Sequence, residues 1–129
     1  MSNFALPGSF IIRLTKLMQQ ISDYNTSQAN WDGFEPSPPT VDAIKNARAL
    51  VLEFASLGEL PVVMTLDDGG ILVEVRLRSA IAQTEAMPTG EFEVTLSING
   101  RVAYESDERP RAALILNELQ NLLAPTEAN

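Results

Sequence analysis

The feature that most constrains the fold is a pair of segments, 71–78 and 91–98, in which apolar and polar residues alternate strictly. If the two pair antiparallel with Ile71 opposite Ile98, their apolar residues fall on one face. On the other face Arg76 then meets Glu93, and Arg78 meets Glu91. One register satisfies both patterns, so the alternation predicts adjacent strands in a sheet with one buried face.

Two further strands are predicted on either side of this pair. Leu60–Leu66 is expected to join 71–78 through Asp67-Asp68-Gly69-Gly70, because Asp-Gly supplies the positive φ of tight hairpins. Asn99-Gly100 is a second hairpin signal and leads into a short strand at Arg101–Glu105. The residues of this strand expected on the inner face are Val102 and Tyr104.

Helical periodicity predicts helices over 9–24 and 41–57, and a third from a cap at Ser106 or Asp107 to Pro125, with Pro110 in its first turn. Thr40 is expected to cap the second helix and Gly58 to end it. The predicted order is α-α-β-β-β-β-α. We therefore expect one α+β domain over 1–129, with flexible tails at 1–8 and 125–129. In this domain, the helices are expected to pack on one face of a four-stranded antiparallel meander.

The chain has neither Cys nor His. This excludes disulfides, thiolate nucleophiles, Cys-ligated zinc and histidine acid–base chemistry. The composition therefore favours a protein that is not an enzyme and uses no cofactor. No segment approaches the roughly 18 apolar residues of a spanning helix, and residues 1–8 carry no basic stretch typical of a signal peptide. We expect a cytoplasmic protein without membrane contact.

The net charge is −8, and the nine Lys and Arg residues are scattered. Direct nucleic-acid binding needs clustered cations that displace counterions, so it is not expected. A distributed negative charge instead speeds the encounter with a basic protein.

Two segments are candidate partner-binding sites. In Trp31-Asp32-Gly33-Phe34, the side chains of Trp31, Asp32 and Phe34 are candidates for binding a partner, with the two aromatic rings as anchors. The alternative is structural: Trp31 and Phe34 plug the edge of the core between two helices, and Asp32 caps a turn. Ser79–Gly90 is predicted to be a long mobile connection. Its Ile81 and Met87 either bind a partner or belong to a lid folded over one end of the sheet.

The Trp31–Phe34 motif and the later Pro61-Val62-Val63-Met64-Thr65-Leu66-Asp67-Asp68-Gly69-Gly70 segment together resemble a family of small bacterial and phage proteins. That family pairs a W-D-G-[YF] loop with a P-x-V-x-x-T-x-D-G-G turn. Met64-Thr65-Leu66 stands where a more proline-rich approach to the turn is common. The resemblance covers roughly residues 10–105. It implies a fold and a bacterial or phage origin, and it transfers no activity or functional residue.

Three functional classes stay open. The first is a non-enzymatic protein-binding module, such as an acidic inhibitor of a basic protein or nucleoprotein of the antitoxin, immunity or phage anti-defence type. The second is a small enzyme or ligand-binding protein that holds a divalent cation with Asp32, Glu35, Asp67 and Asp68. The third is a structural subunit of a homo-oligomer.

Overall fold

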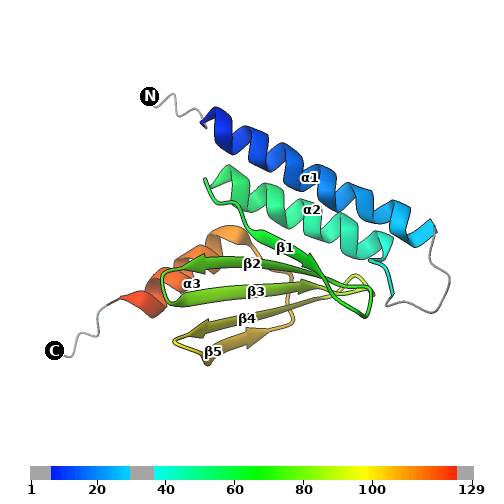
Figure 1. Ribbon diagram of the computed structural model, residues 1–129. Helices are drawn as coiled ribbons and strands as arrows, with labels where there is room; N and C mark the ends of the chain where they lie inside the picture. The colour runs from blue at the N-terminus through cyan, green and yellow to red at the C-terminus, as the bar shows by residue number, and fades with distance from the viewer. Residues whose placement is uncertain (1–6, 30–36, 125–129) are drawn as a thin grey trace.

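The computed structural model describes residues 7–29 and 37–124, and side chains for all of these except 25–29. Three helices and a five-stranded antiparallel sheet form an α+β fold (Figure 1). The helices are α1 (Gly8–Ala29), α2 (Val41–Ser56) and α3 (Ala112–Leu123). The strands are β1 (Val62–Thr65), β2 (Ile71–Leu77), β3 (Ala80–Ala86), β4 (Phe92–Ile98) and β5 (Arg101–Ser106).

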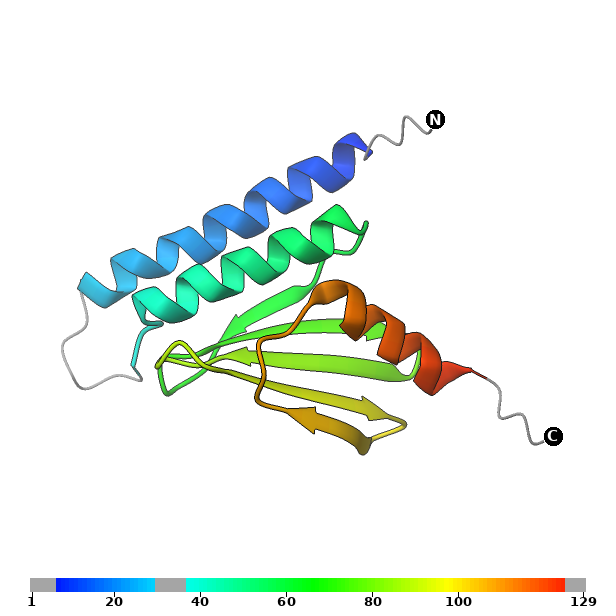
Figure 2. The same cartoon turned by 180° about the vertical axis from the view of Figure 1, so that it is seen from behind.

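The elements lie in layers. α2 contacts β2 and β3, α3 contacts β3 and β4, and α1 packs on α2 as an outer layer. Figure 2 shows the face of the sheet that α3 covers, and Figure 1 shows the opposite face, on which none of the three helices lies. Helices on one face of an antiparallel sheet are therefore confirmed.

The predicted pairing of 71–78 with 91–98 is wrong. The sheet order is β1-β2-β3-β4-β5, so β3 lies between β2 and β4 and the sheet has five strands rather than four. Ile71 lies opposite Ala86, and Ile98 lies opposite Ala80. The predicted ion pairs across this ladder are accordingly not formed. Arg78 lies in the β2–β3 turn, and Glu93 lies opposite Glu85.

The alternation pattern does not predict β3, because the inward-facing residues of this strand are small. The segment alternates between buried and outward-facing residues, and its buried residues are Ala80, Ala82, Thr84 and Ala86. Alanine is depleted in strands and carries little apolar signal in an alternation pattern. Its small side chain has a structural advantage here, because both α2 and α3 pack on β3.

Two-residue turns join β2 to β3 and β4 to β5. Arg78 has φ 57° and Asn99 has φ 51°, the left-handed values that such hairpins use. The prediction for Asn99-Gly100 is confirmed. The turn at Arg78-Ser79 contains no glycine or asparagine, which is a second reason why the sequence predicts a loop rather than a strand over Ser79–Gly90.

β5 also differs from its prediction. The ladder between β4 and β5 shifts register at Leu96/Ser97, so that Tyr104 lies opposite Leu96 while Val102 lies opposite Ser97. A bulge inserts one residue and reverses the alternation beyond it. Tyr104 is therefore on the inner face as predicted, whereas Val102 is on the outer face.

The helix caps are partly as predicted. Thr40 caps α2 by accepting a hydrogen bond from the Ala43 N–H (3.1 Å), and Gly58 follows the helix with φ 84°. α1 is longer than predicted and ends at Ala29. Neither Ser106 nor Asp107 caps α3, which begins at Ala112, after Pro110. Within the described residues, no helix is long and apolar enough to span a bilayer.

The close packing of both helices on β3 predicts that Ala82 will not tolerate a larger side chain. We expect Ala82→Leu to lower the free energy of unfolding by about 1–3 kcal/mol, because overfilling a packed core displaces its neighbours. The outward-facing control Gln83→Leu should change it by less than about 0.5 kcal/mol. Urea denaturation of the two variants measures the difference. Equal stabilities would contradict the placement of β3 in the core.

Candidate functional site

The face of the sheet turned away from α2 and α3, here called the open face, is one of two candidate interaction surfaces. The strand registers align its residues in rows across the sheet. One row crosses all five strands, and its members are Val62, Glu74, Gln83, Thr95 and Glu105. The next row on one side holds Met64, Leu72, Glu85 and Glu93, and the row on the other side holds Arg76, Ile81, Ser97 and Val102.

Negative charge dominates the open face. Its four carboxylates belong to Glu74, Glu85, Glu93 and Glu105, and its cation is Arg76. Arg76 Nη2 lies 3.4 Å from Glu74 Oε2, and Gln83 donates a hydrogen bond to the other oxygen of Glu74 (3.1 Å). Among the described residues, the carboxylates of Glu85, Glu93 and Glu105 form no ion pair with a cation.

The surroundings of Glu85 disfavour its ionised form. It lies directly opposite Glu93, and like charges at opposed positions of a ladder repel. Partial burial, and then the nearby carboxylates of Asp68 and Glu93, raise the pKa of Glu85 above its ordinary value. A cation placed between these groups by another molecule would remove that repulsion.

The structure separates Ile81 from Met87. Ile81 is on the open face near the start of β3, and Met87 follows the end of that strand, roughly 20 Å away at 3.3 Å per residue. The turn that contains Met87 is held on α2, since Thr40 donates a hydrogen bond to Pro88 O (3.0 Å) and Asn46 to Gly90 O (3.0 Å). Ser79–Gly90 is thus neither a mobile binding loop nor a lid, because most of it is β3.

Asp67 and Asp68 form the β1–β2 turn, as predicted. Asp68 Oδ1 accepts a hydrogen bond from the Gly70 N–H (2.9 Å), and backbone bonds join the turn to the segment before α2. Among the described residues, no group of three or more acidic or other metal-binding side chains is positioned to hold a metal ion. The other predicted site residues, Trp31, Asp32, Phe34 and Glu35, lie outside the described residues.

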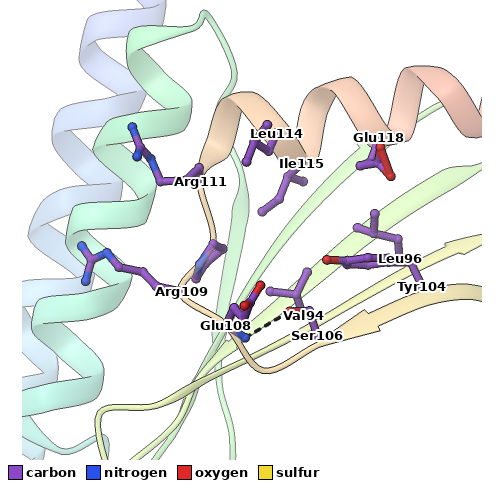
Figure 3. Close-up of a pocket in the computed structure, with 11 residues that line it drawn as sticks. Val94, Leu96, Tyr104, Ser106, Glu108, Arg109, Arg111, Leu114, Ile115 and Glu118 are labelled. Carbon is purple, nitrogen blue, oxygen red and sulfur yellow. Dashed lines mark hydrogen bonds between the residues drawn. The ribbon is translucent and has the colours of Figure 1, made fainter.

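The second candidate surface is a groove between β5 and α3 (Figure 3). Val94 and Leu96 lie on its sheet side, and Leu114 and Ile115 come from α3. The groove exists because α3 packs on β3 and β4, which leaves Tyr104 on the inner face of β5 partly exposed. Its volume is about 100 Å³, well below the roughly 300–1,000 Å³ of small-molecule pockets. It can take one side chain rather than a metabolite.

α2 fixes the position of α3 beside this groove. The Ala112 N–H at the start of α3 donates a hydrogen bond to Glu53 Oε1 (3.0 Å), and Arg111 Nε lies 4.0 Å from the same oxygen. Arg109 is held over the ring of Phe92, with its Cζ 5.7 Å from the ring centroid. Both arginine side chains point toward α2 and away from the groove in Figure 3. Glu53 belongs to another helix, so the sequence around the start of α3 gives no sign of this cap. The sequence analysis therefore does not predict it.

Comparison of the chain with protein-family models, curated proteins and solved structures finds no match.

The cap on α3 predicts a loss of stability in Glu53→Ala. Removing a carboxylate that caps a helix costs about 1 kcal/mol, and we expect that reduction in the free energy of unfolding by urea. Lys45→Ala, an exposed change in the same helix, is the control and should stay within about 0.5 kcal/mol of the wild type. Equal losses in both variants would contradict the capping role.

The raised pKa of Glu85 predicts a pH dependence of stability. Because the folded pKa is above the unfolded one, the stabilisation is present below the unfolded pKa and is lost as the pH rises through the folded pKa. Glu85→Gln should therefore melt at a higher temperature than the wild type at neutral pH, and the difference should shrink toward about pH 4. Thermal melts over this range test it, with Glu59→Gln as the control for net charge. A variant less stable than the wild type at neutral pH would contradict the prediction.

Proposed function

We propose that this protein is a non-enzymatic protein-binding module whose open face docks on a basic partner. The observation that carries the proposal is a sheet face on which none of the three helices packs and whose carboxylates at Glu85, Glu93 and Glu105 have no cationic partner among the described residues. Solubility alone does not explain the charges on this face, because Glu85 and Glu93 lie directly opposite each other, where they repel.

A basic partner would gain from both kinds of residue on this face. Its Lys or Arg side chains would relieve the repulsion around Glu85, and charge-assisted hydrogen bonds are stronger than neutral ones. Exposed Val62 and Met64, with half-buried Leu72 and Ile81 on the same face, would supply apolar contact beside the charges. Protein interfaces combine apolar contact with polar and charged groups in this way.

Within this class we favour an inhibitor of a basic protein or nucleoprotein, of the antitoxin, immunity or phage anti-defence type. A small acidic domain that blocks a basic surface needs no catalytic group of its own. Its net charge of −8 attracts such a target over distance and raises the association rate at low salt.

The proposal predicts that neutralising the open face abolishes binding. Tagged wild type and the triple variant Glu74→Gln/Glu93→Gln/Glu105→Gln are used to capture proteins from lysate of the native host at low and high salt. We expect a basic protein to bind the wild type at low salt, to dissociate as salt screens the charges, and to be absent from the triple variant.

The matched control is Asp23→Asn/Asp42→Asn/Glu59→Gln, which removes the same charge outside the open face. It should retain the captured protein. Loss of binding in both triple variants would show that net charge alone is responsible and would contradict a docking face. Retention in both would place the binding site elsewhere, with Trp31 and Phe34 as the next residues to substitute.

A further inference from the structure

The turn between β4 and β5, Asn99-Gly100, leaves an asparagine side chain open to attack by its own backbone. Both residues are exposed, and a Cβ at Gly100 would meet nothing within 4 Å. Among the described residues, no group accepts a hydrogen bond from the Gly100 N–H. The Gly100 nitrogen is thus accessible beside the Asn99 carboxamide, and glycine has no side chain to block the approach.

We propose that Asn99 is a deamidation site, at which the fold leaves the Asn-Gly linkage open to conversion into aspartate and isoaspartate. The co-reactant is water. The inference rests on the chemistry of one turn and is independent of the proposed basic partner.

The reaction begins when the Gly100 amide loses its proton to hydroxide and its nitrogen attacks Cγ of Asn99. The new N–Cγ bond forms, the bond from Cγ to the carboxamide nitrogen breaks, and ammonia leaves with a proton taken from water. Water then opens the succinimide. Cleavage at Cγ yields aspartate, and cleavage at the backbone carbonyl yields isoaspartate, so neither step involves a change of oxidation state.

The surroundings of this turn favour the anionic nitrogen. The Asn99 N–H donates a hydrogen bond to Ser79 O (3.2 Å), so the β2–β3 turn lies beside the β4–β5 turn at one end of the sheet (Figure 1). Arg78 belongs to the first turn, Arg101 directly follows the second, and neither turn contains a carboxylate. Nearby positive charge favours the deprotonated form of an ionising group. This end of the sheet therefore favours the attack, although the chain carries a net charge of −8.

The hairpin reaches the geometry of attack by opening locally. β5 lies at the edge of the sheet, and its ladder with β4 shifts register at Leu96/Ser97. The residues from Arg101 to Glu105 are all exposed, so opening this hairpin breaks few buried contacts. Segments with few buried contacts open at low free energy. The edge position of the hairpin therefore allows the folded protein to react.

Asp68-Gly69 provides an internal comparison, because an Asp-Gly linkage forms the same succinimide with loss of water. The Gly69 N–H donates a hydrogen bond to Leu66 O (3.3 Å), and Asp68 Oδ1 accepts one from the Gly70 N–H (2.9 Å). Gly69 is buried, and a Cβ on it would lie 3.2 Å from Pro38 O. Both reacting groups are held in place, so the fold protects this turn and leaves Asn99-Gly100 open.

The two products have different effects on the hairpin. Aspartate leaves the backbone unchanged and, like asparagine, tolerates the left-handed φ of 51° at position 99. Isoaspartate routes the chain through the side chain and so adds a backbone carbon to the turn. Because a tight hairpin has a fixed length and geometry, the isoaspartyl form should lose pairing between β4 and β5.

Peptide mapping by mass spectrometry tests the proposal on folded protein and on protein unfolded in urea, incubated side by side at neutral and mildly alkaline pH. In the folded protein, Asn99 should convert within tenfold of its rate in urea, and the rate should rise with pH. It should convert at least tenfold faster than Asn117 and Asn121, which are exposed on α3. Isoaspartate should form at position 99 and not at Asp68 of the folded protein.

An Asn99 that stays intact in folded protein while the unfolded protein converts would overturn the proposal, because the turn would then protect the site. Equal formation of isoaspartate at Asp68 would overturn the contrast between the two turns. Arg101→Gln should slow the conversion at least twofold, whereas the control Arg13→Gln on α1 should not. An unchanged or faster rate in Arg101→Gln would contradict the role of positive charge.

The effect on the hairpin has its own measurement. Ion-exchange chromatography separates converted protein by its additional negative charge, and Asn99→Asp serves as the aspartyl reference. The isoaspartyl protein should melt at a lower temperature than the wild type, and Asn99→Asp should melt close to it. Isoaspartyl protein as stable as the wild type would overturn the predicted loss of pairing.

Discussion

The structure depends on the close packing of two helices against the small inner residues of β3. Ala80, Ala82 and Ala86 leave room for α2 and α3 to pack on the same central strand. Large side chains there would force the helices away from the sheet, since protein interiors are packed nearly as densely as crystals. With both helices on this strand, α1 packs on α2 instead, and the inner face of β5 stays uncovered.

The fold places charged residues that are interspersed along the sequence on two different surfaces of the molecule. Helices α1 and α2 carry both lysines, Lys16 and Lys45, together with Arg13 and Arg48, against Asp23, Asp42 and Glu53. The open face carries four glutamates against Arg76. The net charge of −8 is therefore spread unevenly over the folded molecule. Specific docking depends on such local potentials more than on total charge.

The segment before α2 is joined to the Asp67–Gly70 turn by backbone hydrogen bonds. The Ser37 N–H donates to Asp67 O (3.0 Å), and the Thr40 N–H donates to Gly69 O (3.1 Å). Gly69 has φ 93°, and a side chain there would come within 3.2 Å of Pro38 O. The Asp-Asp-Gly-Gly turn thus has a structural role in joining the start of α2 to the sheet.

The sequence by itself determined three helices, four of the five strands, the Thr40 cap and the Asn99-Gly100 turn, because helical and strand periodicity and turn chemistry act between near neighbours in the chain. Only the tertiary structure decided that β3 lies between β2 and β4, that Glu53 caps α3, and that Glu85 faces Glu93. Each of these depends on residues distant in sequence. At Ala82, in particular, a small side chain is favourable only because two helices pack against β3.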